Sequence, residues 1–155
     1  MILNWLNMNN ILEELIDQKY ISLETYKKDK TSVRTPVWFV IDNDCIYITT
    51  KESTGKVKRL RNNQNVRIAI CSMKGQIKNE WVNGTAKMIV GDNAEKIIKL
   101  RKKKYGFSAR LISAFTSQKG SNVVYSIELV WMILETLKYN LKLNQIHLGQ
   151  IRSIW

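Results

Sequence analysis

The side chains best suited to chemistry lie in residues 49–61. This segment reads Thr-Thr-Lys-Glu-Ser-Thr-Gly-Lys-Val-Lys-Arg-Leu-Arg, so a hydroxyl-rich loop with one glycine precedes a lysine-rich stretch. Free backbone N–H groups at a helix start, with the positive end of its dipole, favour an oxyanion. Ser53 and Thr54 add hydroxyl donors, Gly55 allows close approach to the backbone, and Lys56 adds a positive charge. The pattern by itself suits a phosphate site, but it is more often an ordinary helix cap with a solvated basic face.

The sequence also excludes several other kinds of site. Residues 49–61 do not form a P-loop, because Thr50 stands at the first glycine of G-x-x-x-x-G-K-[ST] and Val57 follows the lysine. The single histidine, His147, excludes a His-rich zinc site and a paired-imidazole mechanism. Cys45 and Cys71 form no C-x-x-C motif, so we expect two reduced core thiols and no metal.

Composition and charge limit the class of protein. The chain has 155 residues, of which 45% are hydrophobic, as expected of one globular domain. Its 25 Lys+Arg and 13 Asp+Glu give a net charge of +12, which suits nucleic acid, an anionic surface or a polyanionic small molecule. The alternative is a solvated lysine-rich surface. The longest apolar run, residues 129–134, is far shorter than the ~20 residues of a membrane span. With no signal-peptide pattern, we expect a soluble, cytoplasmic protein without a membrane partner.

The elements that position these residues follow from hydrophobic periodicity. Alternation predicts strands at residues 20–26, 34–41, 45–50, 66–71, 81–90 and 122–129. Spacing of three to four predicts helices at residues 9–18, 56–61, 92–104 and 107–116. No helix separates the first three strands, which favours an antiparallel meander over a parallel βαβ fold. We therefore predict a mainly β fold with α+β decorations, a six-stranded antiparallel barrel with short helices.

Pro36, Gly84 and the final segment depart from regular strand and helix patterns. Pro36 suggests a strand start, edge or bulge, and Gly84 a possible bulge. We assign residues 1–130 to the barrel domain and residues 131–155 to a C-terminal extension of uncertain structure. Leucines recur every seven residues there, which favours a helix, although alternation over residues 137–143 would suit a strand.

The order of the motifs resembles the pyridoxamine 5′-phosphate oxidase-like split-barrel superfamily, and within it the F420-dependent oxidoreductase group. The resemblance covers about residues 10 to 129 and does not extend to the tail. It is carried by Thr25-Tyr-Lys-Lys-Asp29, Thr35-Pro-Val-Trp-Phe39, Tyr47-Ile-Thr-Thr50, the segment 53–61, Asn65-Val-Arg-Ile-Ala-Ile-Cys71, Gly84-Thr-Ala86 and Lys103-Lys-Tyr-Gly106.

The resemblance implies an FMN-binding-like split barrel that forms a homodimer, with a flavin-like cofactor at the subunit interface. Gly55 stands where some FMN-binding relatives carry an arginine. The implied phosphate contacts are Thr50, Ser53, Thr54 and Lys56, with Lys58 or Arg59 in addition. The implied contacts to the ring are Thr35, Pro36, Val37 and Trp38 on one strand and Thr49 on the next.

Charge bears on the choice of cofactor. Coenzyme F420 carries a phosphodiester and an oligoglutamate tail, whereas FMN carries one phosphate. A basic groove suits the longer anion, and its expected members are Lys51, Lys56, Lys58, Arg59 and Arg61. We predict an F420-dependent oxidoreductase that transfers a hydride to an unknown small-molecule acceptor, with no catalytic residue identified.

Two alternatives stay open. The first is an FMN-dependent oxidoreductase or flavin-binding protein of the same fold. The second is a non-catalytic barrel that binds nucleic acid through strand aromatics. Nucleic acid is disfavoured as a partner because the lysines gather on the predicted helices and not on the strands with the aromatic residues.

Overall fold

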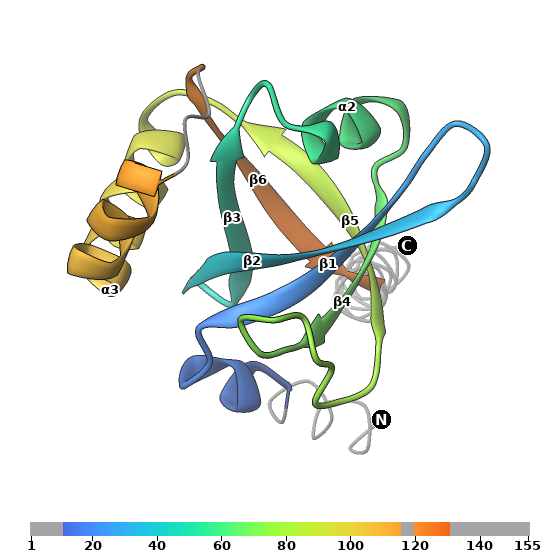
Figure 1. Ribbon diagram of the computed structural model, residues 1–155, viewed down its shortest axis with the longest axis horizontal. Helices are drawn as coiled ribbons and strands as arrows, with labels where there is room; N and C mark the ends of the chain where they lie inside the picture. The colour runs from blue at the N-terminus through green and yellow to red at the C-terminus, as the bar shows by residue number, and fades with distance from the viewer. Residues whose placement is uncertain (1–10, 116–119, 131–155) are drawn as a thin grey trace, which may run out of the picture.

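Antiparallel strands close into a barrel in the computed structural model, which describes residues 11–115 and 120–130 (Figure 1). The strand order around the barrel is β1-β2-β3-β6-β5-β4, and β1 also pairs with β4. This arrangement confirms the predicted six-stranded antiparallel barrel. The strands are β1 (Tyr20–Tyr26), β2 (Ser32–Asp42), β3 (Cys45–Lys51), β4 (Asn65–Ile70), β5 (Val82–Ile89) and β6 (Asn122–Leu129).

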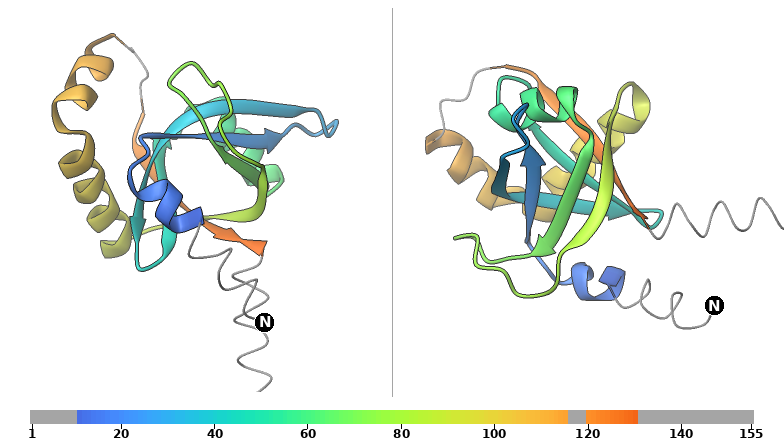
Figure 2. Two further views of the ribbon diagram at one scale, coloured as in Figure 1. Left: turned by 90° about the horizontal axis from the view of Figure 1, so that it is seen from below. Right: turned by 90° about the vertical axis from the view of Figure 1, so that its right-hand side faces the viewer.

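The helices pack around the barrel, and buried residues of two of them join its main apolar cluster. Residues 11–16 are helical and precede β1. Helix α2 (Gly55–Asn62) follows β3 directly, and α3 (Asp92–Phe115) runs beside β2, β3 and β6 (Figures 1 and 2). A kink at Gly106, with φ 28° and ψ −105°, divides α3 where the sequence predicts two helices. No helix within the described residues is long and apolar enough to cross a membrane. The predicted extension, residues 131–155, lies outside those residues.

Period-two alternation fills the barrel. Ile21 and Leu23 of β1 are fully buried in the main apolar cluster, together with Phe39 of β2 and Ile48 of β3. Burying each such side chain contributes roughly 1.5–3 kcal/mol. A second cluster lies under α3, where the outward-facing Val40 meets Ile97 of the helix and its neighbours. The alternation thus places one stripe of each strand in the barrel and the other against a helix or solvent.

Strands β2 and β3 pair along only part of their lengths, which creates the split of the barrel. Residues Phe39 to Asp42 of β2 pair with Ile48 to Cys45 of β3. Residues 32–38 of β2 pair with β1, while residues 49–51 of β3 pair with β6. Pro36 suggests a strand start, an edge or a bulge. The structure places it at a strand edge, because its pairing with β1 continues without a bulge and β3 does not pair with this part of β2.

The bulge predicted at Gly84 is wrong. Strand β5 keeps continuous register through Gly84, which pairs with Val66 of β4 and Leu129 of β6. A Cβ atom at this position would lie 2.9 Å from the backbone oxygen of Glu128. The glycine is therefore explained by the close approach of β6 to β5.

Candidate functional site

Hydroxyl groups link the end of β3 to the start of α2. The Thr54 hydroxyl donates to the carbonyl oxygen of Lys51 at 2.8 Å, and the Thr50 and Thr54 hydroxyl oxygens are 3.3 Å apart. Because the Thr54 proton is directed at Lys51, Thr50 is the donor of this second bond. The Lys56 ammonium donates to the Thr50 hydroxyl oxygen at 3.3 Å. Three of the predicted phosphate contacts, Thr50, Thr54 and Lys56, therefore meet in one place.

The start of α2 is not capped by a side chain. Thr54 holds the N-cap position with extended backbone angles, φ −75° and ψ 151°, but its hydroxyl makes no capping hydrogen bond. The hydroxyl is turned toward Lys51 instead. The ordinary N-cap interpretation of the Ser-Thr-Gly-Lys sequence is therefore wrong in this respect. The positive end of the helix dipole lies beside Lys56.

The Arg59 side chain lies over Gly55. Gly55 is four residues earlier in the chain, so both are on the same face of α2. A Cβ atom at Gly55 would lie 3.0 Å from the Arg59 Nη1 atom. The Arg59 Nε–H donates to the Thr25 hydroxyl oxygen of β1 at 2.7 Å. The glycine thus leaves room for a guanidinium group, and β1 fixes that group. Gly55 and Arg59 are predicted site residues, but Thr25 is not, because nothing in the sequence places β1 next to α2.

Burial lowers the pKa of both cations in this cluster. The Lys56 pKa is lowered by burial and then by the nearby charge of Arg59, and the Arg59 pKa is lowered by burial. Among the described residues, the ion pairs include neither side chain. An oxyanion would supply the missing counter-charge and accept charge-assisted hydrogen bonds from both. The residues present therefore fit a phosphate group, and we call Thr50, Thr54, Gly55, Lys56 and Arg59 the anion cluster.

The rest of the predicted basic groove is engaged elsewhere. Arg61 forms an exposed ion pair with Glu52, with Nη2 2.6 Å from Oε1. The Lys51 ammonium donates to the carbonyl oxygen of Gly120 at 3.0 Å. Ser53 also lies beside Gly120, since a Cβ atom built on Gly120 would be 3.7 Å from the Ser53 hydroxyl oxygen. Lys58 is exposed. The anion cluster is therefore more compact than the predicted groove.

The residues expected to contact a cofactor ring do not share one face of β2. Val37 packs against the barrel interior, and Thr35 alternates with it on the same side. Pro36 and Trp38 face outward, where the Trp38 ring stacks on Tyr105 of α3 with centroids 4.8 Å apart. Thr49 and Thr50 are consecutive in β3 and therefore face opposite sides of it. Thr49 pairs with Val124, which belongs to the cluster under α3. What Thr35 to Trp38 share is the backbone edge left unpaired by β3.

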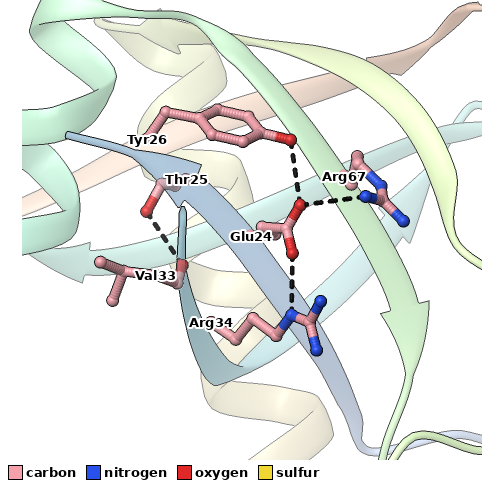
Figure 3. Close-up of polar contacts among 6 residues, drawn as sticks. All are labelled: Glu24, Thr25, Tyr26, Val33, Arg34 and Arg67. Atoms are coloured by element: carbon pink, nitrogen blue, oxygen red, sulfur yellow. Dashed lines mark hydrogen bonds and ion pairs between the residues drawn. The ribbon is translucent and has the colours of Figure 1, made fainter. Parts of the chain in front are cut away.

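A buried carboxylate forms the centre of a second polar cluster, which the sequence does not predict. Glu24 is 2% exposed on the outer face of β1, opposite Arg34 of β2 and Arg67 of β4. Its carboxylate accepts from Arg34 Nε at 2.8 Å and from the Tyr26 hydroxyl at 3.0 Å, and Arg67 Nη1 lies 3.4 Å away. Figure 3 shows how these side chains converge on Glu24. Both guanidinium groups also lie over the Trp81 ring, at 4.8 and 5.2 Å from its centroid.

The pKa of Glu24 reflects this network. Burial acts to raise its pKa, but the hydrogen bonds from Arg34 and Tyr26 and the charge of Arg67 outweigh burial and lower it. The carboxylate is therefore ionised at neutral pH and its charge is compensated. We infer that this cluster holds β1, β2 and β4 together, because Arg34 and Arg67 are the cross-strand neighbours of Glu24.

Three tyrosine hydroxyls of the barrel and of α3 lie away from the anion cluster. The Tyr105 hydroxyl bonds to backbone atoms of Phe39 and Lys19, and burial raises its pKa to about 12. Burial likewise raises the pKa of Tyr47 to about 12. Tyr26 donates to Glu24. None of these contacts links a tyrosine to the anion cluster.

Comparisons with known proteins agree with this fold. The family model for pyridoxamine 5′-phosphate oxidase matches residues 8–134. No curated protein matches the chain. Among solved structures, a candidate pyridoxamine 5′-phosphate oxidase from Listeria innocua superposes with a TM-score of 0.59 and 19% identity, covering 80% of this chain and 94% of that one.

Two further structures show how varied proteins of this fold are. An F420 reductase matches with a TM-score of 0.53 and 17% identity over 76% of this chain and 92% of its own. HutZ, the haem storage protein of Vibrio cholerae, matches with a TM-score of 0.58 and 14% identity, covering 77% of this chain and 87% of its own. At these identities the likeness is one of fold. The family match over most of the chain and the closed split barrel together show that this chain belongs to the pyridoxamine 5′-phosphate oxidase family.

Proposed function

We propose that the chain is an oxidoreductase that binds the phosphate of a flavin-type cofactor at the anion cluster. The observation that carries this proposal is the pair Lys56 and Arg59, two half-buried cations whose pKa values are lowered and which lack a carboxylate partner among the described residues. Holding two cations together away from water is unfavourable unless an anion joins them. Membership of the family supports a flavin-type ligand over other anions.

The chain's own residues divide the work of binding. Lys56 and Arg59 hold the phosphate, with Thr50 and the uncapped start of α2 beside them. The unpaired edge of β2, from Thr35 to Trp38, offers backbone groups to the ring. When bound, the cofactor supplies hydride transfer to a small-molecule acceptor. We further propose that a second copy covers the ring in a cytoplasmic homodimer, with Thr49 at the same site.

Two cofactors suit the cluster, and different observations favour each. The net charge of +12 favours coenzyme F420, which is a polyanion. The compactness of the cluster favours FMN, because Arg61 is neutralised by Glu52 and leaves fewer free cations for a long anionic tail. Both cofactors present a phosphate group, so both readings share the same binding residues.

A fluorescence titration separates the possibilities. We would titrate the apo protein with F420 and, separately, with FMN, comparing wild type, Lys56→Ala and the exposed Lys58→Ala as control. Losing one charge-assisted contact should weaken binding about tenfold or more in Lys56→Ala and little in Lys58→Ala. Tighter binding of one cofactor identifies the branch. Binding of neither would overturn the proposal, and nucleic acid would then be tested as the partner.

A further inference from the structure

Thr25 is the link between the barrel and the anion cluster. Its side chain is 0% exposed, and its hydroxyl oxygen accepts from Arg59 Nε at 2.7 Å. The same hydroxyl lies 3.4 Å from the carbonyl oxygen of Val33 on β2, to which it donates. Its acceptor capacity is thus directed at Arg59. A residue of β1 therefore fixes a side chain that belongs to α2.

The contact decides where the rest of the guanidinium group lies. Arginine has several rotatable bonds, and fixing them costs conformational entropy. Because Nε is engaged by Thr25, the two terminal nitrogens are directed elsewhere, and Nη1 lies over Gly55 next to Lys56 in sequence. The charge of Arg59 there contributes to the lowered pKa of Lys56. Thr25 thus helps hold Arg59 at a place where it repels another cation.

Two adjacent, half-buried positive charges match a dianion better than a monoanion. A phosphate monoester loses its second proton with a pKa of about 6, so it carries nearly two negative charges at neutral pH. A phosphate diester carries one. In a site partly screened from water, the unmatched charge is costly because the effective dielectric constant is low. The nearby Arg61 does not change this balance, since Glu52 neutralises it.

We propose that Thr25 is a positioning residue that holds Arg59 beside Lys56 and so makes the anion cluster selective for a phosphate monoester dianion over a diester. This inference rests on the proposed function, since it assumes that the cluster binds phosphate. Thr25 of β1 itself touches no ligand and acts through Arg59.

A matched pair of variants tests the role of the hydroxyl. Thr25→Val keeps the size and shape of the side chain but removes the acceptor for Arg59, whereas Thr25→Ser keeps the hydroxyl. Phenyl phosphate serves as the monoester probe and diphenyl phosphate as the diester, with affinities measured by calorimetry at pH 7.5. Thermal unfolding without ligand shows whether each variant is folded.

Wild type should bind phenyl phosphate about tenfold more tightly than diphenyl phosphate, since one additional charge-assisted contact is worth about that factor. In Thr25→Val this preference should largely disappear, and Thr25→Ser should restore it. The wild-type affinity for phenyl phosphate should also rise as pH increases through about 6, where the monoester becomes a dianion. In Thr25→Val that rise should be smaller. A role confined to stability would not alter the preference or the pH profile.

A second variant covers the case in which Thr25→Val does not fold. Arg59→Lys keeps the positive charge on α2 but lacks the Nε donor to Thr25, so it should lose the monoester preference as well. Arg61→Lys, on the same helix and paired with Glu52, is the control and should retain it. Failure of wild type to bind either probe would count against the proposed function. Binding with an unchanged preference in Thr25→Val and Arg59→Lys would overturn this inference alone.

Discussion

The Tyr105 hydroxyl lies 2.6 Å from the carbonyl oxygen of Phe39, and through this contact α3 is attached to β2. The same hydroxyl accepts from the Phe39 N–H at 3.2 Å and lies 3.0 Å from the Lys19 carbonyl oxygen. Tyr105 also stacks on Trp38, so one side chain joins the helix to β2 and to Lys19, the residue that precedes β1. The kink at Gly106 follows immediately.

We therefore expect Tyr105→Phe to destabilise the protein. The substitution keeps the ring but leaves buried backbone groups of Phe39 without their partner, at a cost of about 1–3 kcal/mol. Urea-induced unfolding would measure the loss, with Tyr20→Phe as a control that also removes a tyrosine hydroxyl. Equal stability of Tyr105→Phe and wild type would show that water replaces the hydroxyl.

The Glu24 network predicts an acid-dependent loss of stability. The folded-state pKa of Glu24 is lowered, so its contribution is fully present above the unfolded pKa of about 4.3. It is lost as pH falls through the lower, folded-state pKa. Glu24→Gln should cost about 1–3 kcal/mol at pH 7, because Arg34 and Arg67 lose a charged acceptor.

The comparison should be made as unfolding free energy against pH. The difference between wild type and Glu24→Gln should shrink toward zero as pH falls well below 4.3, since the wild-type carboxyl is then also neutral. Glu52→Gln, which alters an exposed ion pair, should change stability little at any pH. A constant difference across the pH range would mean that charge is not what Glu24 contributes.

Gly84→Ala should destabilise the barrel through steric conflict. The new Cβ would lie 2.9 Å from the backbone oxygen of Glu128 and 3.3 Å from side-chain atoms of Ile127 and Leu129. Overpacking of this kind costs roughly 1–3 kcal/mol. Thermal unfolding should show a lower melting temperature than for Asn83→Ala, an exposed neighbour on β5. Similar melting temperatures would mean that β6 moves away without penalty.

Gly55→Ala should separate binding from stability. Its Cβ would lie 3.0 Å from Arg59 Nη1, so the guanidinium group must shift from its place in the anion cluster. The clash involves the end of a flexible side chain, and the backbone at Gly55 has no positive φ, so folding should not suffer. Phosphate binding should weaken several-fold with no fall in melting temperature. Calorimetry on Gly55→Ala and the exposed-site control Lys58→Ala provides the test.

Local pattern accounts for how well the strands were predicted. Alternation over residues 20–26 gives the bounds of β1 as observed, and only Asn43 and Asp44 separate β2 from β3. These features depend on near neighbours in sequence, which is why the meander follows from the sequence. The anion cluster is also largely local, because Thr50, Thr54 and Lys56 lie within one strand-to-helix turn.

The missed features all depend on pairing between distant segments. Glu24 appears in the sequence as one polar residue in an alternating strand, and only the register places it between Arg34 and Arg67. The contact of Thr25 with Arg59 requires α2 to fold back over β1. Gly84 resembles a bulge signal because the approach of β6 is absent from the sequence around it.

The unpaired edge of β2 has a consequence for solubility. An open strand edge is a template on which another chain can add a strand. The continuous β1–β2 ladder requires Pro36, which has no N–H, to direct its nitrogen away from β1 and toward the open edge. The pyrrolidine ring thus interrupts the row of donors there, and the charged Arg34 lies two residues away. Pro36 therefore protects the unpaired edge of β2, where a planar ligand would bind, against aggregation.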